Sequence, residues 1–547
     1  MKRTSILFLI YLIAGIPGLF YGQNYLDVPP DPNFSQDYLN NVIYGDTTES
    51  GERIPDRVYR LQIGGIYYFN NTIKTDGWDL KIVAEGEPTA EFSKAIILTG
   101  VNDQGKTPPF FAEVHGDVLF KNLYFSLLST KNKQVRNLVN VYKDNAHIEM
   151  ENCFVEWAKA FAFARVYSSY VTARLTDSYF RNVSSVGGPY NGKIFKFEDN
   201  PVKEIFVQNC TFANIQGPLI SVHYNTVEKF VFDHNTVVNT IIKPFQFDYW
   251  TEGLVTNNIF FNSASYGNSV TDQTDAEPSG FINVYDIPDS MLSQVNLPSE
   301  NDRRLEVRNN VYFFDQKVEA YLAKWAELDS VQKVRWMNDS TLSFVNDDVN
   351  FPNLNVEDPL MEDVGFFEYP TPDSMIKKMD QWRTDGKKTT WWWVDDDGDK
   401  IGNATDRPHD LSYPTSSIAY TAADNGFPLG DLNWFPDKKA EWQATAIDDQ
   451  NWQVAGQFTL EQNYPNPFNP LTRIDFSLPG SAEVKIKVFN VLGQKVRTLV
   501  NARMKAGQHH VLWDGRDETG RMLPAGVYFY RLELEGARMT RKMILMK

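Results

Sequence analysis

Six polar residues recur in the middle of the chain, each between two apolar residues. They are Asn140, Arg165, Lys196, His223, Asp248 and Asn283. The apolar pairs around them are Val139/Val141, Ala164/Val166, Phe195/Phe197, Val222/Tyr224, Phe247/Tyr249 and Ile282/Val284. Because side chains alternate between the two faces of a strand, inward apolar pairs would leave the polar residues pointing outward. The pattern predicts one polar row across successive strands, with Asn140 and Asn283 as flanking substrate-binding residues.

The four central residues have the types that elimination from a uronate sugar requires. Arg165 would neutralise the sugar carboxylate, and Lys196, crowded by Arg165, would have a lowered pKa and act as the base. His223 is an alternative base or the acid. Asp248 would orient His223 or help to hold a cation. The four residues would span about 15 Å, enough for a few sugar units.

A polar row of this kind does not by itself require catalysis. An ordinary solvated face would also be polar, and neighbouring Asp, His and Lys stabilise a stack without any chemistry. Hydrolysis would need closely placed carboxylates. Among the row's residues only Asp248 is a carboxylate, so elimination is favoured over hydrolysis.

A second candidate site is the acidic segment WWWVDDDGDKIGNATD at 391–406. Asp395, Asp397, Asp399 and Asp406 occupy positions 1, 3, 5 and 12 of a calcium loop. Lys400 stands where such a loop has Gly, so an acidic turn is the alternative. Calcium is the one cofactor that the sequence suggests.

Internal repeats define the elements that would position these residues. EIFVQNCTFANI (204–215) aligns without gaps to KFVFDHNTVVNT (229–240), 25 residues later. Five further segments share the pattern, which places a turn residue at Asn122, Asn152, Asp177, Asn209, His234, Asn257 and Asn309. The steps between these turns are 30, 25, 32, 25, 23 and 52 residues. Such coils of short alternating strands predict a parallel β-helix.

Two apolar columns accompany the turns. Two residues before each turn lie Phe120, Met150, Leu175, Val207, Phe232, Val255 and Val307. Three residues after it lie Phe125, Val155, Phe180, Phe212, Val237, Phe260 and Tyr312. Since each coil lies about 4.8 Å above the last, like residues stack on like and fill the interior.

The two cysteines occupy equivalent positions in this repeat. Cys153 and Cys210 each follow a turn residue, two coils apart, with Ser178 between them. Two coil rises separate them by about 9.6 Å, which is too far for a disulfide. Free, structural thiols are predicted.

Residues 57–86, RVYRLQIGGIYYFNNTIKTDGWDLKIVAEG, resemble the opening coils of β-helix polysaccharide lyases. Over roughly 57–315 the chain resembles the pectate-lyase-like superfamily, which implies a right-handed parallel β-helix. The clustered calcium-binding Asp residues and following Arg base of those lyases are not visible in this sequence. Residues 23–56 are expected to cap the solenoid. Residues 316–455 are expected to form a C-terminal cap and flanking region, with helices at 316–328 and 372–382.

From Phe458 the composition changes to short strands with Gly and Pro turns, which predicts an immunoglobulin-like sandwich. NYPNPFNP (463–470), LGQKV (492–496), WDGRDETG (513–520), PAGVYFYRL (524–532) and KMILMK (542–547) resemble the sorting domain of type IX secretion. The resemblance implies export to the cell surface or medium and recognition of residues 458–547 by the type IX translocon and sorting machinery. Lys2, Arg3 and the apolar run 5–20 predict a signal peptide at 1–22. No later segment has the length and apolarity of a membrane span.

The net charge of −17 disfavours nucleic acid as a partner. The sequence therefore predicts an all-β protein with two possible functions. One is a secreted or cell-surface β-helix that binds polysaccharide and cleaves uronate polymers by elimination. The other is a non-catalytic adhesin or carbohydrate-binding solenoid. A lyase should line an open, positive groove with Arg165 and Lys196, whereas an adhesin could have the same row closed by salt bridges.

Overall fold

The structure is a computed structural model that describes most of the chain. It covers residues 24–546 except 89–92, 186–187, 223, 248, 270–279, 293, 296, 298, 330, 348–349, 386–408, 454–458, 461–462, 464–465, 467, 479–481, 491–494, 505–506 and 535–536. The predicted signal peptide and the candidate calcium loop lie outside the described residues. The chain forms two compact units, one within residues 20–438 and one within residues 439–547.

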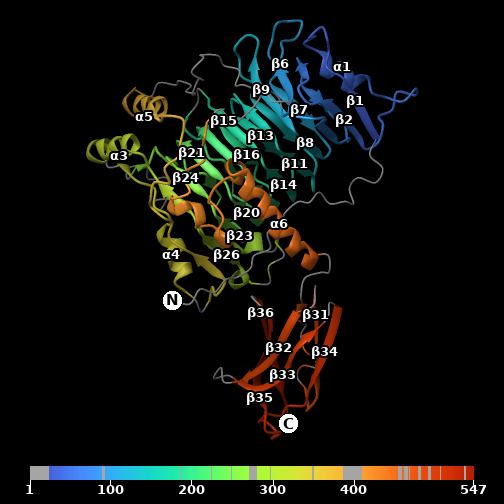
Figure 1. Cartoon of the computed structure of the whole chain (residues 1–547), viewed down its shortest axis with the longest axis vertical. Coiled ribbons are helices and arrows are strands. Elements are labelled where there is room, and N and C mark those ends of the chain that lie inside the picture. Colours follow the sequence, from blue (N-terminus) through green and yellow to red (C-terminus); the bar gives the residue numbers. More distant parts are fainter. Residues whose placement is uncertain are drawn as a thin grey trace. The chain divides into compact units, whose positions relative to one another are not determined.

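Three parallel sheets run along the first unit as a β-helix (Figure 1). The 11-stranded sheet has the order β1 (Asn24–Val28), β2 (Arg57–Gln62), β5 (Leu80–Glu85), β8 (Val118–Lys121), β11 (His147–Glu151), β14 (Val171–Thr176), β17 (Val202–Gln208), β20 (Thr226–Asp233), β23 (Tyr249–Thr256), β26 (Arg304–Arg308) and β29 (Leu354–Val356). The 9-stranded sheet has the order β3 (Ile66–Phe69), β6 (Ala95–Thr99), β9 (Leu123–Ser129), β12 (Phe154–Glu156), β15 (Tyr179–Val183), β18 (Thr211–Ile215), β21 (Thr236–Thr240), β24 (Ile259–Phe261) and β27 (Val311–Phe313). The 7-stranded sheet has the order β4 (Ile73–Lys74), β7 (Phe110–Val114), β10 (Asn137–Val141), β13 (Phe161–Val166), β16 (Lys193–Phe197), β19 (Ile220–Val222) and β22 (Phe245–Gln246).

All seven predicted turn residues adopt a left-handed backbone. Their φ angles lie between 49° and 61°. Asn, Asp and His tolerate this conformation better than most non-glycine residues. The turns join the 11-stranded sheet to the 9-stranded sheet on successive coils, so the repeat predicted from the sequence is confirmed.

The two predicted apolar columns fill the interior. Met150 pairs with Phe120 and Leu175, and Val207 pairs with Leu175 and Phe232. Every residue of both columns is 3% exposed or less. These side chains belong to one continuous core that follows the solenoid.

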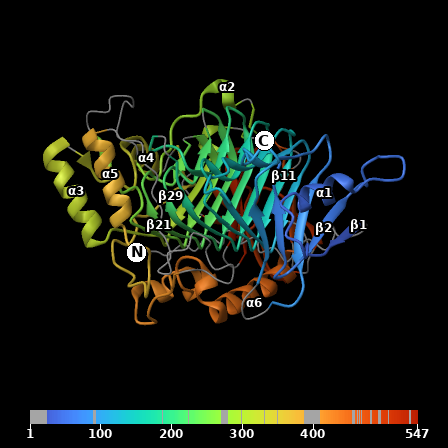
Figure 2. The same ribbon diagram turned by 90° about the horizontal axis from the view of Figure 1, so that it is seen from above.

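Helices lie toward both ends of this unit (Figure 2). Helix α1 (Tyr38–Gly45) buries Leu39 and Ile43 completely against the first coils. Helices α3 (Gln316–Asp329) and α5 (Asp373–Asp385) lie at the sites of the two predicted helices and share an apolar cluster. The remaining short elements before residue 360 are β25 (Asn268–Ser269), β28 (Val331–Gln332), α2 (Asp289–Leu292), α4 (Asp339–Val345) and the 3₁₀ helix η1 (Glu300–Asp302).

The segment with 3₁₀ helices η2 (Ile418–Thr421), η3 (Asp424–Gly426) and η4 (Leu432–Trp434) binds along the turns. Asp431 accepts a hydrogen bond of 2.7 Å from Thr211 Oγ1, and Asn433 Nδ2 donates to the Asn209 carbonyl at 2.9 Å. This segment therefore covers part of the junction between the 11- and 9-stranded sheets.

Cys153 and Cys210 are free and buried, as predicted. The Cys153 backbone N–H donates to Ser178 Oγ at 3.0 Å, which places Ser178 beside Cys153 in the column. Burial raises the pKa of the Cys153 thiol to about 12. The thiol therefore stays protonated and serves as a small apolar side chain.

The C-terminal unit contains two antiparallel sheets. One has the order β30 (Thr459–Leu460), β31 (Thr472–Leu478) and β34 (Gly507–Trp513), and the other β33 (Lys495–Met504), β32 (Ala482–Asn490), β35 (Gly526–Leu534) and β36 (Ala537–Leu545). Helix α6 (Pro436–Gln453) precedes them. Trp513, Tyr530 and Leu532 belong to their shared core. Over the described residues, no helix combines the length and apolarity needed to cross a bilayer.

Candidate functional site

Three of the predicted residues form a row on the outside of the 7-stranded sheet. Strand β13 pairs Arg165 with Asn140 of β10 on one side and with Lys196 of β16 on the other. The residues on both sides of Arg165, Ala164 and Val166, are fully buried. Strand alternation therefore turns Arg165 and Lys196 outward, and their side chains are 22% and 24% exposed.

The row does not continue as the sequence predicted. Lys196 pairs with Ser221, and Ser221 pairs with Gln246. The residues expected in these places, His223 and Asp248, come two positions later and lie outside the described residues. The expected register was wrong by two residues on β19 and β22, so any role for His223 and Asp248 stays a prediction.

The two flanking asparagines are buried. Asn140 is 1% exposed and its Oδ1 accepts a hydrogen bond of 2.8 Å from Asn137 Nδ2. Asn283 is 3% exposed, and its amide bonds to the backbone N–H and carbonyl of Gly280 at 2.8 and 3.1 Å. Asn140 is thus held by the Asn137 side chain and Asn283 by the Gly280 backbone, and a substrate-binding role for either residue stays a prediction.

Glu198, which the sequence pattern did not single out, joins Arg165 to Lys196. Its Oε1 lies 2.6 Å from Arg165 Nε, and its Oε2 lies 2.7 Å from Lys196 Nζ. Burial alone would raise the pKa of Glu198, but the hydrogen bonds from Lys196 and Arg165 lower it overall. One ionised carboxylate therefore contacts both cations, and the three groups together keep one net positive charge. Glu198 stands two residues after Lys196, the spacing that returns a strand to the same face.

A stack of rings lies beside the charged residues. His115, Tyr142 and Tyr167 follow β7, β10 and β13 directly, and we call these three residues the aromatic ladder. The His115 and Tyr142 ring centroids are 5.0 Å apart at 17°, and those of Tyr142 and Tyr167 are 4.8 Å apart at 4°. Tyr142 is 38% exposed and Tyr167 is 36% exposed. The ladder presents ring edges and two phenol groups to solvent.

Backbone pairing fixes the ladder in register. The Tyr142 N–H donates to the Val114 carbonyl and the Tyr167 N–H to the Val141 carbonyl, each at 2.9 Å. The Glu198 N–H continues the series to the Val166 carbonyl, also at 2.9 Å. The Arg165 guanidinium lies 4.9 Å from the Tyr167 ring centroid. The ladder and Glu198 therefore form one row along the solenoid, parallel to the row of Arg165 and Lys196.

Lys193 is a second group that the sequence pattern did not single out. It is 8% exposed, and its Nζ lies 3.0 Å from Ser221 Oγ and 3.1 Å from Gln246 Oε1. Burial, with a smaller contribution from the charge of Lys196, lowers its pKa to about 8. Neutral polar groups enclose the amine, and its hydrogen bonds link β16 to β19 and β22, the next two strands of the sheet.

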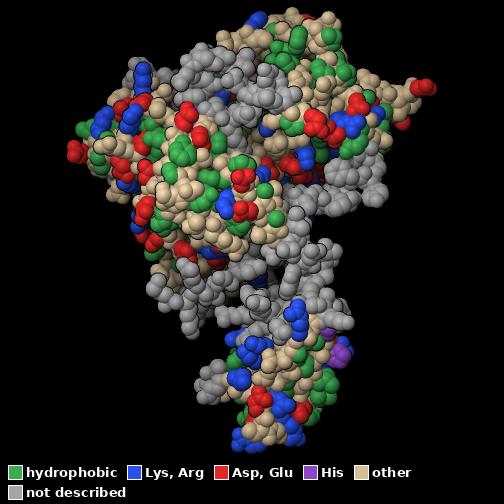
Figure 3. Space-filling view, in the orientation of Figure 1, with side chains coloured by type: hydrophobic (Ala, Val, Ile, Leu, Met, Phe, Trp, Pro, Cys, Tyr) green, Lys and Arg blue, Asp and Glu red, His purple; other side chains and the backbone are tan. Residues whose placement is uncertain are grey.

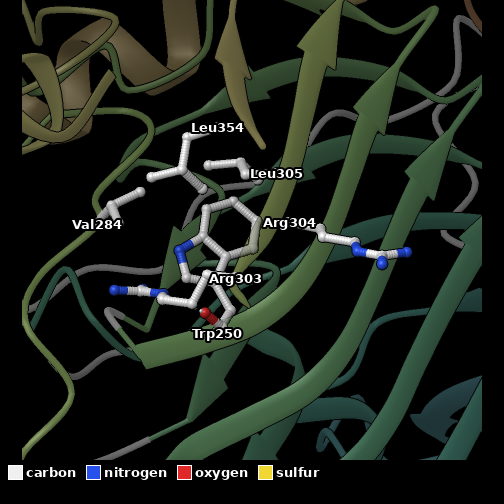
Figure 4. A pocket seen from close by; sticks show the side chains of 6 residues that line it. All are labelled: Trp250, Val284, Arg303, Arg304, Leu305 and Leu354. Atoms are coloured by element: carbon white, nitrogen blue, oxygen red, sulfur yellow. Dashed lines mark hydrogen bonds between the residues drawn. The ribbon is translucent and has the colours of Figure 1, made fainter. Parts of the chain in front are cut away.

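Among the described residues, no group of three or more His, Cys, Asp or Glu side chains is placed to hold a metal ion. A shallow hollow that encloses essentially no space for a ligand is lined by Trp250, Val284, Arg303, Arg304, Leu305 and Leu354 (Figure 4). The two arginines point in opposite directions, and Arg303 donates to the Trp250 and Tyr285 carbonyls.

The fold and its outer rows define an all-β, solenoid protein with an immunoglobulin-like C-terminal domain. Residues 470–537 match the family model described as the FlgD Ig-like domain. No curated protein matches the chain. Among solved structures, dimeric latent PorU from Porphyromonas gingivalis is similar at 17% identity over 16% of this chain and 9% of its own, with a TM-score of 0.15.

Two further solved structures are similar over short stretches. PorZ, described as an essential surface component of the type IX secretion system of Porphyromonas gingivalis, is 16% identical over 16% of this chain and 11% of its own, with a TM-score of 0.12. FlgD from Pseudomonas aeruginosa is 20% identical over 17% of this chain and 75% of its own, with a TM-score of 0.12. This chain thus spans about a tenth of PorU and of PorZ.

Proposed function

We propose that this protein is a non-catalytic, cell-surface β-helix that binds polysaccharide through the aromatic ladder. The single observation that carries the proposal is the stack of His115, Tyr142 and Tyr167, with two partly exposed phenol groups in line along the solenoid. The stacked rings turn their edges and hydroxyls outward, so the row can exchange hydrogen bonds with sugar O–H groups and make apolar contact with the sugar rings.

Binding is favoured over elimination because of Glu198. Elimination needs a cation free to meet the sugar carboxylate and an amine free to remove a proton. In this protein Arg165 and Lys196 both contact the Glu198 carboxylate. The salt-bridged row is the arrangement expected of an adhesin or a binding solenoid.

We further propose export by the type IX route. The proposal rests on the motifs of residues 463–547 and on the immunoglobulin-like fold of this tail. Its partners would be the type IX translocon and sorting machinery.

The test is binding of the full-length mature chain to a panel of soluble polysaccharides, measured by affinity electrophoresis and calorimetry. The double variant Tyr142→Ala/Tyr167→Ala should weaken binding at least about tenfold. Tyr25→Ala is the matched control, because Tyr25 is also 36% exposed but lies on β1 of another sheet. Equal binding by both variants would refute the ladder as the site.

Catalysis is tested with the same panel, with calcium and with a chelator. We expect no absorbance from unsaturated products with any uronate polymer. A signal that disappears in both Arg165→Ala and Lys196→Ala would show that the protein is a lyase and overturn the non-catalytic proposal.

A further inference from the structure

The charges around the aromatic ladder identify the class of polysaccharide. On the described part of this face the cations are Lys74, Arg165, Lys196 and the largely buried Lys193, and the carboxylates are Glu113 and Glu198. Lys74 Nζ contacts Glu113 Oε2 at 2.9 Å, and Glu198 contacts the other two cations. Lys74, Arg165 and Lys196 are therefore each in an ion pair, and the Lys193 amine is held by Ser221 and Gln246.

A polyanion would meet two obstacles here. To reach Arg165 or Lys196 it would have to displace Glu198, whose lowered pKa keeps it ionised at neutral pH. It would also approach an acidic body, because residues 20–438 hold 36 Lys and Arg against 59 Asp and Glu. Long-range repulsion of this kind slows association and weakens binding of like-charged ligands.

The spacing of the ladder fits an extended sugar chain. The rings repeat every 4.8–5.0 Å along the solenoid axis, and their planes are within 17° of parallel. Each coil of a β-helix rises by about 4.8 Å, so an extended polymer whose sugars advance by a similar distance would place one sugar beside each ring. Successive sugars can then meet equivalent ring edges and hydroxyls.

We infer that the ligand is an uncharged, extended polysaccharide that lies along the aromatic ladder, parallel to the solenoid axis. The inference rests on the proposed function, and it replaces the uronate polymer expected from the sequence. Affinity comes from ring contacts and hydroxyl hydrogen bonds, while the ion pairs of Glu113 and Glu198 exclude polyanions.

The experiment compares polymers with one backbone and different charge. Hydroxyethylcellulose and carboxymethylcellulose form the matched pair, with galactomannan and polygalacturonate as a second neutral and a second acidic probe. The full-length protein should bind a neutral probe at least about tenfold more tightly than its acidic counterpart. Neutral binding should change less than about twofold between low and high NaCl, since it uses no unpaired charge.

Glu198→Gln provides the internal check, and thermal unfolding confirms that the variant is folded. It removes the carboxylate that compensates Arg165 and Lys196, so it should raise carboxymethylcellulose affinity several-fold in low salt. It should leave the affinity for the neutral probe within about twofold. An unchanged carboxymethylcellulose affinity would contradict the role given to Glu198.

The outcomes separate the inference from the proposed function. Tighter, salt-sensitive binding of the acidic probes by the wild-type protein, lost in Tyr142→Ala/Tyr167→Ala, would overturn the neutral ligand and keep the carbohydrate-binding function. Absence of binding to every probe would overturn both.

Discussion

At the scale of single residues, Glu198 determines how the face responds to pH. The pKa of Glu198 is lower in the folded protein than in the unfolded chain, where it is about 4.3. The ionised carboxylate therefore stabilises the fold at pH values above the unfolded pKa, and this stabilisation is lost as pH falls through the folded pKa. Glu198→Gln should lower the free energy of unfolding by about 1 kcal/mol near pH 7, and by progressively less as pH falls through the folded pKa of Glu198. Unfolding midpoints of both proteins across this range test it. A difference that grows on acidification would contradict the assigned sign.

The residues of the site differ in how far the sequence could reveal them. The sequence predicts Arg165 beside Lys196 because each lies between two apolar residues, Ala164/Val166 and Phe195/Phe197. Only one alternation of inward apolar and outward polar side chains fits these two strands. Near Ser221 the apolar residues Ile220, Val222 and Tyr224 alternate with two polar residues, Ser221 and His223, so either polar residue fits the place beside Lys196. Glu198 gives no such signal, because it stands one residue beyond the end of β16, where the alternating apolar pattern stops.

At the scale of elements, amide side chains connect one coil to the next at two corners. Asn258 Nδ2 donates to the Phe232 carbonyl at 2.8 Å and to Asn310 Oδ1 at 3.0 Å, while its Oδ1 accepts from the Asn235 N–H at 2.8 Å. The second corner stacks Asn182, Asn214, Asn239 and Asn262, linked at 3.1–3.4 Å.

Asn258→Ala should destabilise the solenoid by about 1–3 kcal/mol, because it leaves buried backbone groups without partners. Asn353→Ala is the control, since Asn353 is exposed. The measurement is the urea midpoint of the full-length protein followed by circular dichroism. Equal midpoints for the two variants would mean that the amide column contributes nothing.

The elements are predictable wherever a residue type repeats at the same position. The turn column is clear in the sequence because Asn, Asp or His occupies all seven places. The second corner also leaves a signal, since Asn214, Asn239 and Asn262 each stand five residues after a turn residue. The hydrogen bonds of Asp431 to Thr211 and of Asp424 to Asn257 are not derivable in this way, because the sequence carries no distance between such remote residues.

At the scale of the whole molecule, the two units carry opposite charge. Residues 458–547 hold 14 Lys and Arg against 8 Asp and Glu, whereas residues 20–438 are strongly acidic. Figure 3 shows Lys and Arg side chains on the described surface of the C-terminal unit. Each unit has its own apolar core. Separate cores of this kind allow one unit to be changed without unfolding the other.

Removal of residues 458–547 should therefore abolish delivery to the cell surface without changing polysaccharide binding. Expressed in a bacterium that has a type IX secretion system, the truncated chain should accumulate in the periplasm and be lost from the cell surface, as measured by fractionation and surface proteolysis. The purified truncated protein should keep its polysaccharide affinity within about twofold, because the aromatic ladder lies in the other unit. Surface delivery without the tail would refute its role in sorting, and lost affinity would show that the ladder depends on it.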